Sequence, residues 1–287
     1  MPDQSNISED GNIQVKYGPE MENIYPFLTT LSGEKRVLFV TTSNRSEYIE
    51  GLGEKPKSTL VAEHMAKLLE EKGVSVQIID AAKLKIHNCL GCVSELHGNM
   101  CGVKKSKVKD EKKNPHGHLR CWASLDYPDD EIWRIANGIY DSTAIVFFAS
   151  QRWGNPNAIY QKVIERLDWI ENMHHCYGEP STIKGKKAGF VLLGQNWRVQ
   201  KSLETQQQVL RYFGFDTPSE IYMGWQYTRD SNDENLESYK EAPSTFEQSW
   251  GIEIPEEKKE KKLKESEEFK VVQVSNFDSF ISKLNWK

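Results

Sequence analysis

Short runs of consecutive apolar residues alternate along the chain with segments in which apolar residues recur at helical spacing. Continuous apolar runs are typical of strands that are buried on both faces of a sheet. We predict five such strands, at residues 36–43, 74–80, 143–149, 187–194 and 219–225. Strands that alternate with helices indicate a parallel sheet covered by helices on both faces.

The segments between the strands predict the helices of such a fold. From Ser58 to Lys72 the apolar residues fall on one helical face, and Gly73 follows at a position that favours the end of a helix. We expect further helices near residues 129–139, 156–172 and 198–213. Together, strands and helices predict one α/β domain over residues 36–228.

Three segments stand outside this pattern. Residues 1–35 are polar and aperiodic and predict an extended N-terminal arm, while residues 229–287 form a charged C-terminal extension. Residues 102–126 form a lysine-rich insertion within the domain. Because blocks of charge usually stay hydrated, we interpret the insertion as a solvated surface loop.

The charge balance limits the classes of function. The 287 residues contain 37 Lys and Arg against 42 Asp and Glu, a net charge of −5, which disfavours extensive nucleic-acid binding. No apolar run reaches the roughly 20 residues that span a bilayer, and no secretion signal stands at residue 1. With five cysteines and no such signal, we expect a cytoplasmic protein with no nucleic-acid or membrane partner.

The loops after the strands carry the candidate chemistry, because open parallel sheets bind ligands beyond the carboxyl ends of their strands. Residues 42–46 contain no glycine, which excludes the dinucleotide fingerprint, and Pro56 breaks the phosphate-loop motif that begins at Gly53. What remains is a hydroxyl-rich loop that enters a helix at Ser58 and Thr59. These hydroxyls either cap the helix or accompany the binding of a phosphate monoester at its N-terminus.

The loops after the third and fourth strands each place a tryptophan beside amide side chains. They read Ala-Ser-Gln-Arg-Trp-Gly-Asn at 149–155 and Gly-Gln-Asn-Trp at 194–197. Aromatic side chains stack on planar rings, and amides match the polar edges of such rings. Together with the hydroxyl-rich helix start, these loops favour a phosphate-bearing planar heterocycle as the ligand.

The same loops match the motifs of a known family. The family's first loop reads Gly-Ser-Pro-Arg, with Asn-Thr at the following helix start. Here Ser43 and Arg45 coincide with that pattern, and Ser58-Thr59 take the place of Asn-Thr.

The family's second loop reads Ser-Pro-x-Tyr-Trp-Gly-Asn. Residues 153–155 match its end, Arg166 matches the end of the next helix, and residues 149, 150 and 152 depart from the pattern. On these motifs, residues 36–225 resemble the NADPH-dependent FMN reductase-like family of the flavodoxin-like superfamily, which is related to iron–sulfur flavoproteins.

The resemblance implies a flavodoxin-like three-layer α/β sandwich, with a five-stranded parallel sheet of order 2-1-3-4-5 and helices on both faces. It also implies FMN as cofactor, NAD(P)H as cosubstrate and a homo-oligomer, either a dimer or a tetramer. Hydride would pass from NAD(P)H through FMN to a quinone, a flavin or a similar small acceptor, with no catalytic side chain. The residues expected to bind FMN are Ser43, Arg45, Ser46, Ser58, Thr59, Gln151, Arg152, Trp153, Gly154, Asn155, Gly194, Gln195, Asn196 and Trp197.

Two other classes of function stay open. An electron-carrier flavoprotein would bind FMN and pass electrons to protein partners. An interaction protein on the same fold would bind no flavin and would use the insertion and the charged extension as docking surfaces.

The cysteines also leave alternatives open. Cys89, Cys92 and Cys101 fall at three of the four positions that ligate a cluster in the related iron–sulfur flavoproteins, while Glu95 occupies the remaining position. Cys121 could complete a cluster or a zinc site, the latter also with His116 and His118. Structural thiols without a metal are the third reading. His174, His175 and Cys176 are expected to be helix-end or interface residues.

Overall fold

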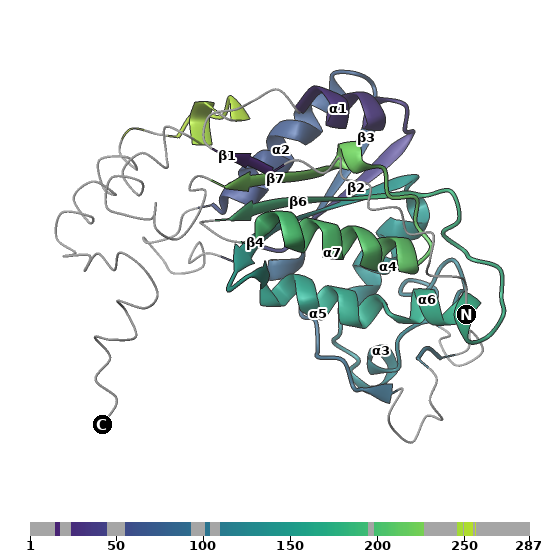
Figure 1. Cartoon of the computed structure of the whole chain (residues 1–287). Helices are drawn as coiled ribbons and strands as arrows, with labels where there is room; N and C mark the ends of the chain where they lie inside the picture. The colour runs from purple at the N-terminus through teal and green to yellow at the C-terminus, as the bar shows by residue number, and fades with distance from the viewer. Residues whose placement is uncertain are drawn as a thin grey trace, which may run out of the picture.

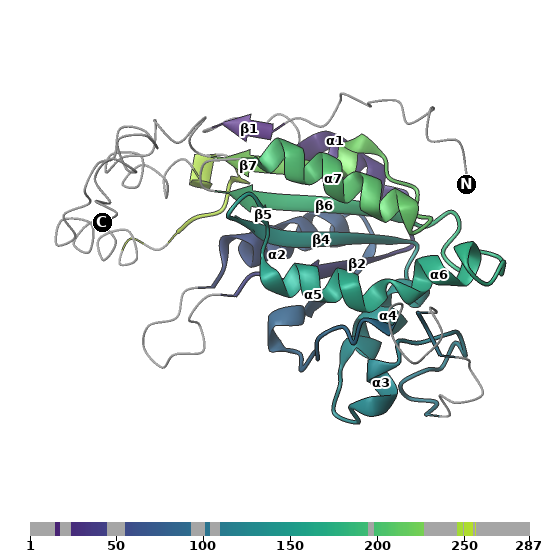
Figure 2. The same ribbon diagram turned by 60° about the horizontal axis from the view of Figure 1, so that its bottom comes forward.

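The computed structural model describes residues 15–17, 24–44, 55–92, 101–103, 110–194, 198–226, 246–248, 250–254 and 256. Within these ranges a parallel sheet forms the centre of the molecule, with helices on both faces (Figures 1 and 2). The body of the sheet consists of β2 (Arg36–Thr41), β3 (Ser75–Asp80), β4 (Ala144–Arg152), β6 (Lys187–Gly194) and β7 (Tyr222–Gln226).

These five strands are all parallel and lie in the order β3-β2-β4-β6-β7. Numbered along the chain, this is the order 2-1-3-4-5 of the flavodoxin-like fold, so the predicted fold class is confirmed. The strand order reverses between β2 and β4, because the chain adds β3 on one side of β2 and then returns to add β4 on the other. Open α/β sheets bind ligands at such a reversal.

Helices connect the strands. They are α2 (Lys57–Glu70), the short α3 (Ala123–Asp126), α4 (Ile132–Asp141), α5 (Ala158–Leu167), α6 (Trp169–His175) and α7 (Val199–Tyr212). Helix α2 covers one face of the sheet, and α4, α5 and α7 cover the other (Figures 1 and 2). The predicted helices are confirmed, although the one expected at 156–172 is divided into α5 and α6. Within the described ranges, no helix has the length and apolarity to cross a membrane.

Part of the segment predicted as an extended arm is a helix, so that expectation is wrong for residues 24–32. Helix α1 (Ile24–Ser32) buries Ile24, Phe27, Leu28 and Leu31, whose spacing places them on one helical face. It packs against α2 and against the 3₁₀ turn η6 (Ser219–Ile221). The helix therefore completes the layer that α2 begins.

Two further short strands lie outside the predicted five. Strand β1 (Val15–Tyr17) pairs in parallel with β7 and extends the sheet at that edge. Strand β5 (Asn155–Pro156) folds back antiparallel onto the end of β4. Strand β7 also begins later than predicted, because residues 219–221 form η6.

The interpretation of the insertion as a solvated loop is wrong for its described part near residues 119–123. Leu119, Arg120, Cys121 and Ala123 are all buried, and Val103 pairs with Arg120 in an antiparallel bridge. This stretch contains apolar side chains that are buried, although the insertion as a whole is rich in lysine. The insertion is thus packed on the domain at this point.

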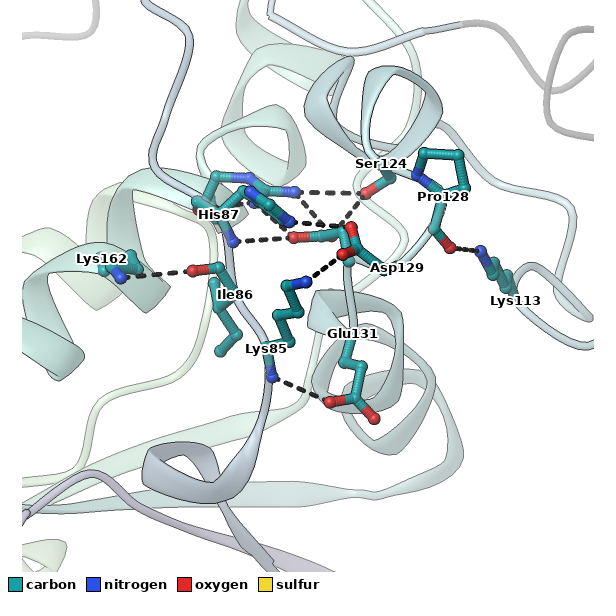
Figure 3. A network of polar contacts seen from close by, with 11 residues as sticks. Lys85, Ile86, His87, Lys113, Ser124, Pro128, Asp129, Glu131 and Lys162 are labelled. Atoms are coloured by element: carbon teal, nitrogen blue, oxygen red, sulfur yellow. Dashed lines mark hydrogen bonds and ion pairs between the residues drawn. The ribbon is translucent and has the colours of Figure 1, made fainter.

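A polar network joins the insertion, the residues 128–131 that follow it and α5 to the chain after β3 and its 3₁₀ turn η3 (Ala81–Lys83) (Figure 3). The Lys85 backbone N–H donates to the Glu131 carboxylate at 2.8 Å, and the Lys85 ammonium forms an ion pair with Asp129. The Lys162 ammonium donates to the Ile86 carbonyl at 3.2 Å, and Lys113 donates to the Pro128 carbonyl at 2.6 Å. Three of these four contacts therefore have a backbone N–H or carbonyl group as one partner.

The C-terminal extension contributes two aromatic side chains to the core. Phe246 and Trp250 stand four residues apart and are 0% and 3% exposed. The Phe246 ring meets Trp225 of β7 edge-on, with ring centroids 5.7 Å apart. The remainder of residues 229–287 lies largely outside the described residues, and the predicted domain boundaries stay predictions.

Candidate functional site

A pocket open to solvent lies beyond the carboxyl ends of the strands, where the strand order reverses. It is lined by Ser43, Asn44, Pro56, Lys57, Ser58, Ser150, Gln151, Arg152, Leu193, Gly194 and Trp225. These residues come from the ends of β2, β4, β6 and β7 and from the N-terminus of α2. The location is the one that this strand order favours for a ligand.

Two of the predicted hydroxyls meet in this pocket. Ser43 follows β2, Ser58 lies in the first turn of α2, and their Oγ atoms are 2.6 Å apart. Pro56 is the N-cap residue of α2, with φ −58° and ψ 140°, and no side chain caps the helix. The alternative in which Ser58 or Thr59 caps the helix is therefore wrong.

Thr59 lies beside the pocket but is not among its lining residues. It is buried, and its hydroxyl has no hydrogen-bond partner among the described residues. Its backbone N–H donates to the Pro56 carbonyl at 3.0 Å. In this arrangement Ser58 faces the pocket more directly than Thr59.

The loop after β2 is held by a buried contact that sequence reasoning missed. The Thr42 hydroxyl approaches the Asn157 side-chain oxygen at 3.0 Å, and the Asn157 amide donates to the Thr42 carbonyl at 2.6 Å. Thr42 also donates its backbone N–H to the Phe148 carbonyl at 2.9 Å. These bonds fix the residue that directly precedes Ser43, so they position the first pocket hydroxyl.

The hairpin at the end of β4 carries five predicted residues, of which two line the pocket. Gln151 is buried and donates to the Ser202 hydroxyl at 2.9 Å, and Ser202 in turn donates to the Gly154 carbonyl at 3.1 Å. Arg152 lines the pocket from the exposed side of the strand. Helix α7 therefore anchors the hairpin beside the pocket.

Trp153 and Gly154 form the tip of this hairpin rather than a pocket wall. Both have positive φ angles, 49° and 76°, and Arg152 pairs with Asn155 across the turn. Trp153 is 87% exposed. Trp153, Gly154 and Asn155 are thus near the site but are not among its lining residues.

Gly194, one of the residues expected to bind FMN, ends β6 and lines the pocket. A Cβ atom at this position would stand 2.5 Å from the Val199 Cγ2 atom and 2.9 Å from the Gln151 Cβ atom. Glycine is therefore needed here, because α7 and β4 both come close to the end of β6. The predicted residues Arg45, Ser46, Gln195, Asn196 and Trp197 lie outside the described residues.

Sequence reasoning missed two pocket residues with strong chemical character. Lys57 is the first residue of α2, and its ammonium nitrogen lies 5.5 Å from the centre of the Trp225 ring and 5.2 Å from that of Phe246. Trp225 lies near the carboxyl end of β7, where a ligand contact is expected, so its position in the sequence could have identified it as a site residue. No sequence pattern indicated the contact between Lys57 and Phe246.

The charged side chains among the described residues of the pocket are all cations. Lys57 and Arg152 are the charged side chains among its described lining residues, and no carboxylate accompanies them there. The N-terminus of α2 adds the positive end of the helix dipole. Hydroxyls, amides and two cations together suit an anionic group such as a phosphate ester.

Three of the cysteines, Cys92, Cys101 and Cys121, are buried, and none of them lines the pocket. Burial raises the pKa of Cys101 and of Cys121, and for Cys121 the nearby Arg166, whose Nε–H donates to the sulfur at 3.2 Å, works against this shift. Burial also raises the pKa of Cys92. Within the described residues, no three His, Cys, Asp or Glu side chains are grouped so that they could hold a metal ion. The cluster and zinc readings gain no support from this geometry.

The chain has no match among protein-family models or curated proteins. Among solved structures it is similar to RosB with the bound intermediate 8-demethyl-8-formylriboflavin-5'-phosphate, with 10% identity, a TM-score of 0.47, and 87% of this chain and 85% of that chain covered. An azoreductase from Bacillus anthracis is similar with 13% identity, a TM-score of 0.44, and 82% and 100% covered. FerB, a flavoenzyme NAD(P)H:acceptor oxidoreductase from Paracoccus denitrificans, is similar with 16% identity, a TM-score of 0.37, and 64% and 75% covered.

The strand order and the pocket define the class of this protein. It is an α/β protein of the flavodoxin-like fold, with a cationic, hydroxyl-rich pocket at the point where the strand order reverses.

Proposed function

We propose that this protein is an FMN-dependent NAD(P)H oxidoreductase that passes electrons to a quinone, a flavin or a similar small acceptor. The observation that carries the proposal is the pocket at the strand reversal, in which the cations Lys57 and Arg152 accompany serine hydroxyls. This set of donors fits the phosphate and the polar ring edge of FMN.

The residues of the pocket divide into two groups by the part of FMN that they suit. Ser43, Ser58 and the first turn of α2 offer hydrogen-bond donors to the phosphate. Gln151, Arg152 and Gly194, at the ends of β4 and β6, lie across the pocket and suit the ribityl chain and the ring. When bound, FMN would supply the redox chemistry, as a two-electron carrier between a reduced nicotinamide and an acceptor.

The protein's own part in such a reaction is binding and orientation. The bonds from Ser202 hold Gln151 and the β4 hairpin, and the Thr42–Asn157 pair holds the loop that carries Ser43. Rigid supports of this kind keep a cofactor and a substrate in register. The proposal assigns no acid or nucleophile to the chain.

The test is an anaerobic visible absorption spectrum of the purified protein with added FMN, recorded before and after NADPH. The expected result is a bound-flavin spectrum that bleaches promptly on addition of NADPH, followed by steady NADPH oxidation when a small quinone is supplied. Bound flavin with poor quinone turnover would favour an electron carrier. Absence of flavin binding would contradict the proposal and favour an interaction protein.

A variant that introduces a negative charge at the expected phosphate position sharpens this test. Ser58→Asp would set a carboxylate against the phosphate, and we expect FMN affinity to fall by at least about 100-fold, because like charges in close contact cost several kcal/mol. Ser32→Asp is the matched control, because Ser32 ends α1 on the exposed surface near the amino end of β2. Equal FMN affinity in Ser58→Asp and the wild type would remove the phosphate from this part of the pocket.

A further inference from the structure

Lys57 combines a position in the lining of the pocket with contacts to two aromatic rings. It is the first residue of α2 and lines the pocket beside Ser58. Its ammonium nitrogen lies 5.5 Å from the centre of the Trp225 ring and 5.2 Å from the centre of the Phe246 ring. The ammonium is therefore close to two aromatic rings at the edge of a polar pocket.

The two rings form a rigid support. Trp225 and Phe246 are 2% and 0% exposed, and they meet edge-on with an angle of 83° between their planes. An aromatic ring attracts a cation through the negative potential of its face. Contacts of this kind restrict the long lysine side chain in advance, so less conformational entropy is lost when it binds an anion.

Lys57 also belongs to the same helix turn as Ser58, one member of the hydroxyl pair. Ser58 follows it directly, and the Ser58 Oγ atom lies 2.6 Å from the Ser43 Oγ atom. The other cation of the pocket, Arg152, comes from the hairpin at the end of β4. A phosphate at the N-terminus of α2 would thus meet Lys57 together with the serine hydroxyls.

We infer that Lys57, supported by Trp225 and Phe246, is the side chain that binds the phosphate group of FMN. The inference rests on the proposed function and specifies how its cofactor is held. Because Phe246 belongs to the segment that follows the predicted α/β domain, the C-terminal extension would take part in cofactor affinity through Lys57.

The experiment compares FMN with riboflavin, which lacks the phosphate. Both ligands are titrated into the full-length wild-type protein and the variants Lys57→Met and Lys57→Arg, at low and at moderate salt. We expect Lys57→Met to bind FMN about 10- to 100-fold more weakly, which is the range for a lost hydrogen bond to a charged group, and to bind riboflavin as the wild type does. Its FMN affinity should also depend less on salt, and Lys57→Arg should restore most of the affinity.

Lys55→Met is the matched control. Lys55 precedes α2 by two residues, and its ammonium pairs with the Glu63 carboxylate at 2.8 Å on the exposed surface. This variant removes the same charge and the same side-chain atoms from a neighbouring position, and we expect its FMN affinity to stay within about twofold of the wild type. Phe246→Leu should weaken FMN binding by less than Lys57→Met and leave riboflavin binding unchanged.

Each other outcome overturns the inference in a recognisable way. Equal losses for FMN and riboflavin in Lys57→Met would assign Lys57 a structural role. The phosphate contact would be overturned, and the proposed function left standing, by either of two results. One is that Lys57→Met binds FMN as tightly as the wild type does. The other is that the wild-type protein binds riboflavin as tightly as FMN. Failure of the wild type to bind either flavin would overturn both.

Discussion

The guanidinium group of Arg166 forms a fully buried, two-pronged ion pair with the carboxylate of Asp130. Its two terminal nitrogens lie 2.8 Å from the two carboxylate oxygens, and both side chains are 0% exposed. The same guanidinium donates to the His87 carbonyl at 2.7 Å and to the Cys121 sulfur at 3.2 Å. One residue of α5 therefore joins the insertion to the segment that follows β3.

Replacement of Arg166 by Met should strongly destabilise the protein. The substitution keeps an apolar stem of similar length but leaves the Asp130 carboxylate buried without its partner. A buried charge left in this way costs about 3–5 kcal/mol, and we expect the free energy of unfolding to fall by that amount. Urea unfolding followed by circular dichroism measures the loss.

Arg134→Met provides the comparison for this prediction. Arg134 is exposed and pairs with Glu131 at 3.3 Å, so its replacement should cost less than about 1 kcal/mol. The double variant Asp130→Asn with Arg166→Met should recover part of the loss, because it removes the uncompensated charge. A loss in Arg166→Met no larger than that in Arg134→Met would show that the pair does not hold the insertion.

The pH dependence of stability should report on Glu34. Burial works to raise the pKa of Glu34, but hydrogen bonds from Lys187 and Thr143 and the charge of Lys187 together lower it below its usual 4.5. Since the pKa is lower in the folded state, the contribution is complete above about pH 4.5 and is lost as the pH falls through the lowered pKa. Glu34→Gln should therefore reduce the free energy of unfolding by up to about 1 kcal/mol at neutral pH, with a smaller difference at acidic pH.

Urea unfolding of Glu34→Gln and the wild type at several pH values between neutral and acidic tests this dependence. The ammonium of Lys187 lies 2.8 Å from the Glu34 carboxylate, and this pair joins the turn before β2 to the start of β6. A difference between the two proteins that stays constant as the pH falls below 4.5 would exclude the ion pair as its cause.

The cysteines are expected to differ in reactivity. Cys176 is exposed and Cys89 is half-buried, whereas Cys92, Cys101 and Cys121 are buried. The pKa is raised in the three buried thiols and also in Cys176, with burial as the first cause in each, so accessibility separates the two groups. Iodoacetamide at mildly alkaline pH should therefore modify Cys176 and Cys89 in the folded protein, and the other three only after unfolding.

Mass spectrometry of the alkylated peptides, with and without prior treatment by a chelator, measures this pattern. If the three buried thiols act as structural side chains, the chelator leaves their protection unchanged. Protection that the chelator removes would instead show that a metal ion holds them, and would revive the cluster or zinc reading.

The sheet could be predicted from the sequence because each of its central strands is covered on both faces. Residues 145–149 of β4 are at most 1% exposed, and such burial requires the continuous apolar run by which the strand was recognised. Helix α1 was missed although Ile24, Phe27, Leu28 and Leu31 have helical spacing. It is only nine residues long and holds Pro26 in its first turn, where proline is tolerated but weakens the pattern.

The site could be predicted only where it depends on strand ends and on local motifs. Ser43 and Gly194 end two of the predicted strands, Ser58 begins a predicted helix, and the pocket brings the three together. The neighbourhood of Lys57 and Phe246 depends on how the C-terminal extension packs against β7, which no local pattern encodes. Long-range contacts between an extension and a domain need the folded structure.

The hairpin tip at Trp153 should be a site of backbone strain. Trp153 has φ 49° and Gly154 has φ 76°, which are the signs of a type I′ turn, and this turn favours Asn-Gly. A side chain other than glycine or asparagine costs roughly 1–2 kcal/mol in the left-handed region. Trp153→Asn should therefore raise the free energy of unfolding by about 1 kcal/mol, whereas Trp153→Phe keeps the strain and should give no gain.

An FMN titration of both variants tests the stacking predicted for the Trp153 ring. A loss of FMN affinity confined to Trp153→Asn would place the ring on the cofactor. Equal FMN affinity in the two variants would leave the ring outside the site.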